Sequence, residues 1–232
     1  MSSPTDRFFN GFTRSALRFL SQIRSHNDRT WFDAHRSDYE RHLLAPLRDL
    51  VTDLAPSMAD IDPLFELRPA VGKTISKIFR DTRFSRDKSP FRSTMWITFK
   101  RPAKHWLEIP AYFFELSSET YRFGMGFYAA GPGTMDELRA RMEKDPRAFL
   151  QAIAFYPEQS IFHLEGETYR RPIPNQMAPE IQPWYQKKSF YLVSNRLADD
   201  LLLRRELVDE LMDGYRVLAP IYRYLVASGT TR

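Results

Sequence analysis

The side chains best suited to chemistry are concentrated in residues 80–92, which we call the basic loop. This stretch reads Arg80-Asp81-Thr82-Arg83-Phe84-Ser85-Arg86-Asp87-Lys88-Ser89-Pro90-Phe91-Arg92. Five cations, two carboxylates and three hydroxyl groups share its thirteen positions. Arginine presents a planar fork of donors that matches phosphate and carboxylate oxygens, and lysine presents a compact positive charge. The composition therefore predicts a site for an anionic ligand.

The candidate ligand-binding residues are the five cations and one hydroxyl group: Arg80, Arg83, Ser85, Arg86, Lys88 and Arg92. Two carboxylates cannot neutralise five cations, so part of the positive charge is available to an anion. Asp81 and Asp87 have two interpretations. Either they pair with neighbouring arginines and hold the loop in shape, or they act as general base or metal ligand in an enzyme.

Three functions follow from these residues. The favoured one is an anion-binding protein that recognises a phosphorylated ligand or a nucleic-acid backbone through the basic loop. The second is an enzyme that acts on a phosphate-containing substrate with Asp81 or Asp87 as its acid or base. The third is a structural role, in which the loop is a charged clamp between a helical layer and a sheet. The sequence identifies neither the ligand nor the oligomeric state.

Other site signals are weak. With no cysteine, the chain has no disulfide, thiolate metal site or cysteine nucleophile. His35 and His42 lack the spacing of metal ligands, so we expect no metal and no cofactor. Gly124-Met125-Gly126 lies in a strand-like run with no helix after it, which favours close backbone packing over a nucleotide-binding motif.

The positive charge of the chain is local. The net charge is +5, but residues 68–104 hold eleven lysines and arginines against two aspartates, a charge of +9, and the remainder carries −4. Such a concentration favours an anionic partner, such as phosphate groups or nucleic acid. A solvated basic face at the side of a sheet is the competing explanation.

The overall composition is that of a globular protein, with 43% apolar and 27% charged residues in 232. No apolar stretch is long enough for a membrane helix, so no membrane association is expected. The first residues lack the basic and apolar regions of a secretory signal. Together with the missing cysteines, this predicts a cytoplasmic protein.

Residues 12–58 are predicted to be helical. Thr13 is suited to cap a first helix and Asp28 to begin a second, because short polar side chains accept hydrogen bonds from the first helical N–H groups. Pro46 lacks the donor that a helix interior requires, so the helix should kink or restart there.

Residues 70–128 are predicted to be mainly β structure. Apolar and polar residues alternate in four runs, 74–80, 94–100, 109–116 and 121–128. Their connections are too short for helical crossovers, which favours an antiparallel meander. The basic loop is the one long connection, and long loops in compact domains are often functional.

Several aromatic residues are expected to lie in the core. Phe84 and Phe91 should anchor the two ends of the basic loop. Four others are expected in the core or in a pocket wall rather than as stacking platforms for bases, namely Trp31, Tyr39, Tyr112 and Tyr128.

The remaining segments are predicted as helical over 134–156, irregular or β over 160–195, and helical over 198–227. Pro146 suits the first turn of a helix, and Pro220 should interrupt the last one. A hairpin is expected over 161–171 and a strand over 189–194. No linker divides the chain, so residues 1–232 are predicted to form a single α+β domain, an antiparallel meander with N-terminal and C-terminal helices packed on it.

The basic loop, from Arg80 to Phe91, resembles the signature of the family called domain of unknown function 2461. Further matches are Gly11-Phe12, Asn27 with Trp31-Phe32, Tyr39, Pro46 and Leu218-Ala219-Pro220. They run from the first helix to the last, so the resemblance covers nearly the whole chain. Residues 127–130 depart from the family pattern, which has a tyrosine and a nearby proline after the glycines. The resemblance implies no activity, but it marks the basic loop as the place of a site.

Overall fold

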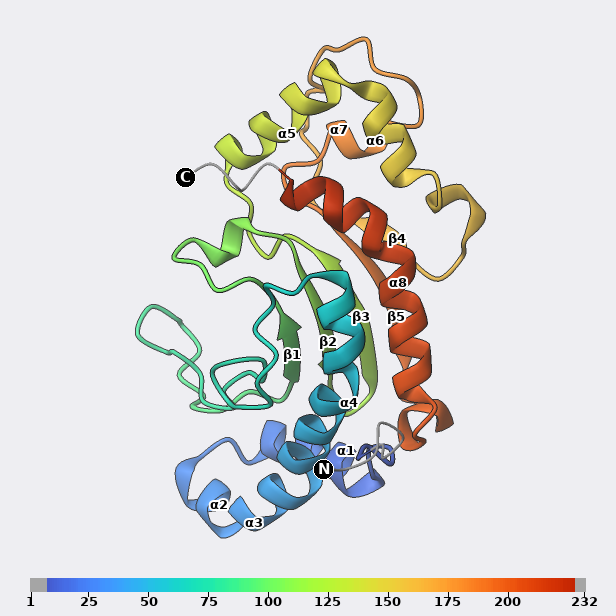
Figure 1. Ribbon diagram of the computed structural model, residues 1–232. Coiled ribbons are helices and arrows are strands. Elements are labelled where there is room, and N and C mark those ends of the chain that lie inside the picture. The colour runs from blue at the N-terminus through green and yellow to red at the C-terminus, as the bar shows by residue number, and fades with distance from the viewer. Residues whose placement is uncertain (1–7, 228–232) are drawn as a thin grey trace. The chain divides into compact units, whose positions relative to one another are not determined.

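A computed structural model describes residues 8–227 and shows a five-stranded antiparallel sheet with the strand order β1-β2-β3-β5-β4 (Figure 1). The strands are β1 (Met95–Phe99), β2 (Ala111–Leu116), β3 (Thr120–Gly126), β4 (His163–Glu165) and β5 (Tyr191–Leu197). N-terminal helices and the C-terminal helix pack on this sheet. The predicted α+β class and the antiparallel sheet with helices at both ends of the chain are therefore confirmed.

The helices are α1 (Arg14–Ser25), α2 (Arg29–Ala34), α3 (Arg36–Asp38), α4 (Ala45–Ile61), α5 (Pro132–Lys144), α6 (Pro146–Ile153), α7 (Gln182–Tyr185) and α8 (Leu207–Val226). A π-helical segment, η1 (Tyr39–Leu44), leads into α4. Short 3-10 turns are η2 (Trp106–Glu108), η3 (Tyr156–Glu158) and η4 (Asp200–Leu203).

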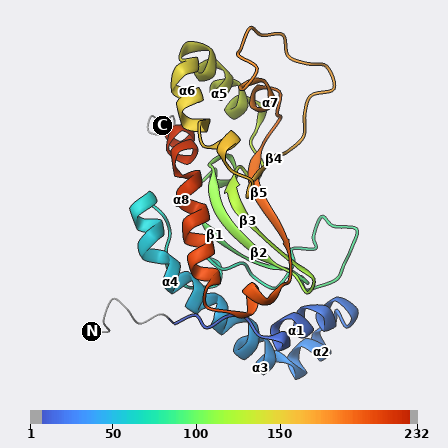
Figure 2. The ribbon, with the colours of Figure 1, turned by 90° about the vertical axis from the view of Figure 1, so that its right-hand side faces the viewer.

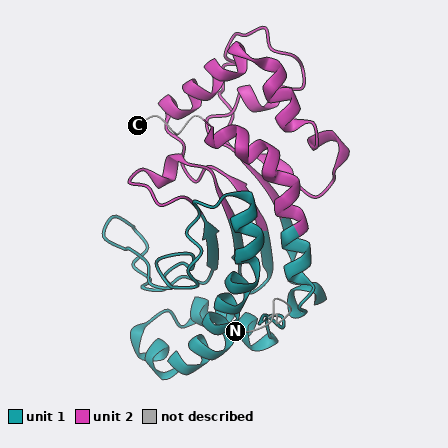
Figure 3. Cartoon of the chain, viewed as in Figure 1, with its two compact units in different colours: residues 1–99, 113–122, 195–212 teal, residues 100–112, 123–194, 213–232 magenta. Residues whose placement is uncertain are grey.

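The described chain groups into two compact units (Figure 3). Unit 1 holds the residues up to 99 together with 113–122 and 195–212. Unit 2 holds 100–112, 123–194 and the residues from 213 onward. The basic loop and the helices α1 to α4 all lie within unit 1. A single domain over residues 1–232 stays a prediction.

The N-terminal helices of unit 1 begin where the sequence predicts. The Thr13 side chain accepts a hydrogen bond from the N–H of Ala16, and Asp28 accepts one from Trp31. Pro46 lies in the first turn of α4, directly after the π-helical segment, so the helix restarts there as predicted. An apolar stripe on α4 is buried, and the helix packs against β1.

The segment 74–80 is not the regular strand that its alternation predicts. It forms isolated antiparallel bridges, Ile75 with Ile97 and Phe79 with Phe91. The N–H of Ser76 donates to the Trp96 carbonyl (2.9 Å), and the N–H of Thr98 donates to the Thr74 carbonyl (2.8 Å). The segment thus follows the outer side of β1 for a few residues and then leaves it to pair with the base of the basic loop.

In unit 2, β3 and β5 approach so closely that side chains are excluded at two glycines. A Cβ on Gly124 would lie 1.9 Å from the Leu192 carbonyl oxygen, and one on Gly126 would lie 2.3 Å from the Cα of Tyr191. This confirms that Gly124-Met125-Gly126 serves close backbone packing. Only glycine permits this separation, because any Cβ would overlap the neighbouring backbone.

The predicted hairpin over residues 161–171 is wrong. The strand β4 pairs antiparallel with β5 instead, and Leu164 lies opposite Leu192. Gly166 ends β4 with a φ of 129°, a conformation that favours glycine and turns the chain away. Thr168 then bridges to Lys187, so both halves of the expected hairpin pair with the later segment rather than with each other.

The helix α8 continues through Pro220, so the predicted interruption is wrong. Figure 2 shows this helix running along the sheet. Its residues beside the proline, Leu218, Ile221 and Tyr222, are fully buried. In unit 2, the ring of Tyr215 contacts Tyr112 at 5.1 Å between centroids. This burial offsets the roughly 3 kcal/mol that a proline costs inside a helix.

Candidate functional site

The two ends of the basic loop are joined by a short antiparallel ladder. The N–H of Arg80 donates to the Pro90 carbonyl and the N–H of Arg92 to the Ile78 carbonyl, both at 2.8 Å. From this base the loop projects outward as two limbs, the blue-green loop at the left of Figure 1. The backbone pairing places Arg80 opposite Pro90 and Arg92 opposite Ile78, so the two arginines lie on opposite limbs, on either side of the bridge between Phe79 and Phe91.

Asn27, in the turn between α1 and α2, holds the base of the loop. Its amide Nδ2 donates to the Phe91 carbonyl (3.0 Å), and its Oδ1 accepts from the Phe91 N–H (2.9 Å). The Phe91 ring stacks on Phe32 of α2 at 4.4 Å between centroids, and it is 2% exposed. The prediction that Phe91 anchors the loop in the core is confirmed.

Ion pairs and hydrogen bonds connect the two limbs. The Arg80 guanidinium pairs with Asp87, and Asp87 Oδ1 accepts hydrogen bonds from the N–H (2.9 Å) and the hydroxyl (2.6 Å) of Ser89. Lys88 Nζ donates to the Thr82 carbonyl at 2.9 Å. The limbs are therefore held together by contacts within the loop.

Both carboxylates of the loop are engaged locally. Asp81 accepts hydrogen bonds from Arg83 Nε (3.0 Å) and from its second terminal nitrogen (2.7 Å), and these lower the pKa of Asp81 to about 2. Hydrogen bonds from Ser89, and then from Arg80, hold the pKa of Asp87 below its usual value. A carboxylate with so low a pKa is a weak general base at neutral pH.

The apex of the loop is a turn closed by a hydrogen bond from the N–H of Ser85 to the Thr82 carbonyl at 3.3 Å. Phe84 lies in this turn with 95% of its surface exposed. The expectation that Phe84 anchors the loop in the core is therefore wrong. Hydrophobicity alone suggested burial, whereas the turn directs the side chain into solvent. Tyr128, which was also expected in the core or a pocket wall, is 75% exposed.

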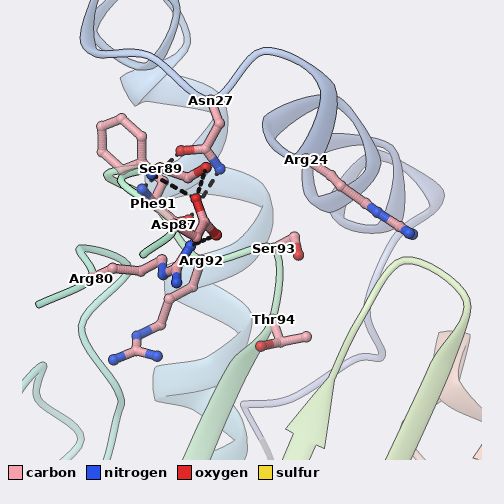
Figure 4. A pocket seen from close by; sticks show the side chains of 9 residues that line it. All are labelled: Arg24, Asn27, Arg80, Asp87, Ser89, Phe91, Arg92, Ser93 and Thr94. Atoms are coloured by element: carbon pink, nitrogen blue, oxygen red, sulfur yellow. Dashed lines mark hydrogen bonds and ion pairs between the residues drawn. The ribbon is translucent and has the colours of Figure 1, made fainter. Parts of the chain in front are cut away.

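A polar pocket of about 270 Å³ opens at the base of the basic loop, within unit 1 (Figure 4). It is lined by three arginines, one aspartate and small polar residues: Arg24, Asn27, Arg80, Asp87, Ser89, Phe91, Arg92, Ser93 and Thr94. Figure 4 shows Arg24 on one side and Arg80 and Arg92 on the other. Its formal charge is +2, from three arginines and one aspartate.

The structure brings two of the six predicted ligand-binding residues, Arg80 and Arg92, to this pocket. Ser85 does not line it, but its hydroxyl lies 3.5 Å from the Arg80 guanidinium. The other three predicted residues, Arg83, Arg86 and Lys88, lie farther out on the loop and are exposed. The predicted set therefore divides into a pocket group and a group near the apex.

Arg92 is the cation of the pocket with the fewest partners. Its Nε is buried without a hydrogen-bond partner among residues 8–227, and its guanidinium lies over the Trp96 ring at 4.7 Å. Arg80, by contrast, is paired with Asp87. Arg24 lies 3.6 Å from the Glu119 carboxylate, and both side chains are largely exposed. A buried N–H donor without an acceptor is uncommon in proteins.

Sequence reasoning missed several lining residues. Asn27 carried a signal, because it is one of the positions that resemble the family signature, but that resemblance did not suggest a place beside the loop. Ser93 and Thr94 directly follow the loop, and the predicted site, which was defined by the charged residues of the loop, ended two residues too early. Arg24 lies 56 positions before Arg80 in the sequence, and no local pattern connects the two.

The described residues show no group of three or more acidic, histidine or cysteine side chains placed to hold a metal ion. Within residues 8–227 no helix combines the length and the apolar character that crossing a bilayer requires.

The comparison with known families covers the part of the chain that holds this pocket. The family described as conserved hypothetical protein, DUF2461, matches residues 15–224. The matched region includes the whole basic loop and every residue that lines the pocket. No curated protein matches the chain. Since the match extends over most of the 232 residues, the chain belongs to the DUF2461 family of conserved hypothetical proteins.

Proposed function

We propose that this protein binds the phosphate group of a phosphorylated ligand in the pocket at the base of the basic loop. The observation that carries the proposal is Arg92, whose buried Nε has no hydrogen-bond partner among the described residues. Leaving a buried donor without an acceptor costs about 1–3 kcal/mol. A small movement of the Arg92 side chain toward the pocket would let an anionic oxygen accept from this nitrogen and recover that free energy.

The rest of the lining suits the same ligand. Arginine guanidinium groups bind phosphate oxygens through paired N–H donors, and the hydroxyls of Ser89, Ser93 and Thr94 are additional donors. A formal charge of +2 favours a dianion such as a phosphate monoester. The volume of about 270 Å³ accommodates the phosphate and a small part of the attached molecule.

The carboxylates support binding over acid–base catalysis. Asp81 does not line the pocket, and Asp87 does so only as a partner of Arg80 and Ser89. The pKa values of both are low, which makes them poor bases at neutral pH. A cytoplasmic location is part of the proposal, since the chain has no cysteine and phosphorylated metabolites are abundant there.

Isothermal titration calorimetry with inorganic phosphate tests the proposal. We expect Arg92→Gln to weaken binding at least about tenfold, because a hydrogen bond to a charged group is worth roughly 1.5–3 kcal/mol. Arg68→Gln is the matched control, since Arg68 belongs to the same basic segment but pairs with Glu66 and does not line the pocket. Equal phosphate affinity in the wild type and Arg92→Gln would overturn the proposal.

The alternative in which the loop is a charged clamp is distinguished by the stability of two variants, Arg80→Ala and Arg92→Gln. If the loop charges serve only to hold the fold, Arg80→Ala lowers the unfolding temperature strongly, and the wild type shows no saturable phosphate binding. Under our proposal, the intact protein binds phosphate, and Arg92→Gln melts within a few degrees of the wild type because its lost partner is a ligand. Thermal unfolding followed by circular dichroism measures both variants.

A further inference from the structure

The apex of the basic loop presents an aromatic ring to solvent. Phe84 is the third residue of the turn Thr82–Ser85, which the Ser85 N–H closes onto the Thr82 carbonyl at 3.3 Å. At 95% exposure it is the most exposed large apolar side chain among residues 8–227. Because Phe84 lies at the apex of a closed turn, the course of the backbone directs its side chain toward solvent. The exposure of the ring is therefore a property of the turn and not of one side-chain rotamer.

A cation that is paired with a neighbouring carboxylate lies over one face of this ring. The Asp81 carboxylate holds Arg83 through its Nε (3.0 Å), its terminal nitrogen (2.7 Å) and its backbone N–H (3.2 Å). The guanidinium so held lies over the Phe84 ring, 5.7 Å from the centroid. Because nearly all of the side chain is exposed, the ring keeps an open face for a second flat partner.

The limbs of the loop hold this apex in place. Lys88 Nζ donates to the Thr82 carbonyl, at the first residue of the turn, and Arg80 pairs with Asp87 one step closer to the base. A loop ordered in its free state loses less conformational entropy when it binds. The apex is therefore a preorganised surface.

We infer that Phe84 is a stacking platform for a nucleobase, and that the phosphorylated ligand is a single-stranded nucleic acid. An exposed ring with basic neighbours is the combination that binds single strands, because every base has a flat face and every nucleotide a phosphate. Arg86 has no hydrogen-bond or ion-pair partner in the described part of the chain, so it is available to the strand backbone. The inference rests on the proposed function for the phosphate contact in the pocket, whereas the base contact at Phe84 is independent of it.

A single strand fits the apex better than an anionic membrane does. Phe84 is the only apolar side chain between Asp81 and Ser89, and one phenylalanine gives a membrane little apolar area to bury. The carboxylates of Asp81 and Asp87, each 57% exposed, would be brought toward the anionic lipid headgroups. Stacking on one base, by contrast, needs only one ring.

Fluorescence anisotropy with labelled DNA strands of about 12 nucleotides tests the inference. The probes are a single strand, the matching duplex and an abasic strand that keeps the phosphates but lacks the bases. We expect the wild type to bind the single strand more tightly than either of the other two. Phe84→Ala should weaken binding of the single strand at least about fivefold and leave the abasic strand unchanged, because stacking on one base contributes that much or more.

Two further variants separate stacking from apolar contact. Phe84→Trp should retain the affinity for the single strand, whereas Phe84→Leu, which keeps apolar area but has no aromatic face, should behave like Phe84→Ala. The inference is overturned if Phe84→Leu binds like the wild type, if Phe84→Ala has no effect, or if the single strand does not bind. Phe84-dependent binding to vesicles of phosphatidylserine and phosphatidylcholine without binding to the strand would also overturn it in favour of a membrane.

The phosphate titration keeps the two proposals distinct. If inorganic phosphate binds in an Arg92-dependent manner but Phe84→Ala leaves strand binding unchanged, the nucleobase inference fails and the phosphate site stands. If Phe84 variants lose the strand but Arg92→Gln binds phosphate like the wild type, the apex contact stands and the proposed pocket function fails.

Discussion

The side-chain amide of Asn27 makes hydrogen bonds with both the N–H and the carbonyl of Phe91, as the backbone of a neighbouring strand would do. We expect Asn27→Ala to lower the free energy of unfolding by about 2 kcal/mol or more, since two hydrogen bonds are lost and two partly buried backbone groups are left unpaired. Urea denaturation measures the change. Asn10→Ala is the control, because Asn10 makes an exposed hydrogen bond to Phe8.

The change in Asn10→Ala should stay within about 0.5 kcal/mol, as for most surface substitutions. Equal effects of the two asparagine variants would show that the base of the basic loop does not depend on the Asn27 amide.

Ser89 sets the acidity of Asp87. Its hydrogen bonds are the largest cause of the lowered pKa, ahead of the Arg80 guanidinium. Ser89→Ala should therefore raise the pKa of Asp87 toward its usual 3.8. Carboxyl carbon chemical shifts followed by NMR through the acid range measure this. Thr52→Ala is the control, because the Thr52 hydroxyl donates to the Arg48 carbonyl on α4 and should leave the titration unchanged.

The same contact makes stability depend on pH. A folded pKa below the unfolded value means that ionised Asp87 stabilises the fold above about pH 4, and the contribution is lost as the pH falls through the folded pKa. The unfolding temperature should therefore fall less on acidification in Ser89→Ala than in the wild type. An identical pH profile would show that Asp87 is not held by Ser89 in solution.

At the scale of elements, the contact between β3 and β5 depends on two glycines. Gly124→Ala would place a Cβ 1.9 Å from the Leu192 carbonyl oxygen, so one of the strands must move. We expect a loss of roughly 1–3 kcal/mol in the free energy of unfolding, the usual cost of overpacking. Differential scanning calorimetry or urea denaturation measures it.

Gly133 provides the matched control for this substitution. It lies in α5, and a Cβ there would meet nothing within 4 Å. Gly133→Ala should therefore stabilise the protein by up to about 1 kcal/mol, because alanine favours the helix over glycine. A Gly124→Ala variant as stable as Gly133→Ala would contradict the close approach of the strands.

Elements with strong local signals were predictable from the sequence. Thr13 and Asp28 carry the capping chemistry that begins α1 and α2, and Pro46 marks the start of α4. The prediction of a hairpin over 161–171 was wrong because β4 pairs with a strand about thirty residues later, and local alternation of apolar and polar residues does not reveal such a partner. The predicted interruption at Pro220 was wrong for a related reason. The burial of α8 outweighs the tendency of one proline to break a helix.

In the candidate site, too, the features with a local sequence signal were predictable and those that depend on distant contacts were not. The basic loop was recognisable from its charges, and Phe91 was correctly expected in the core. Phe84 has the same side chain seven residues earlier, and the turn between Thr82 and Ser85 decides its different exposure. Arg24 and Asn27 reach the pocket through the fold of the helices, so no pattern within the loop could include them.

At the scale of the whole molecule, neither compact unit is a continuous segment of the chain. The strands β2, β3 and β5 and the helix α8 each begin in one unit and end in the other. Breaking hydrogen bonds in any of them affects backbone that belongs to both units. We therefore expect one cooperative unfolding transition in urea, with coincident curves from tryptophan fluorescence and far-ultraviolet circular dichroism.

Trp31 and Trp96 lie in unit 1 and Trp106 and Trp184 in unit 2, so variants that keep the tryptophans of one unit report on each separately. Two separated transitions in these variants would show that the units unfold independently, against the predicted single domain.

The segment beside β1 has a consequence for solubility. β1 is an end strand of the sheet, and the backbone of residues 74–76 occupies the hydrogen-bonding groups of Trp96 and Thr98 on its outer side. An uncovered end strand can recruit the same strand of another molecule and begin aggregation. Substitutions that release residues 74–76 should therefore reduce yield and promote aggregates even where the pocket at the base of the basic loop is untouched, which makes this short irregular segment a safeguard against aggregation.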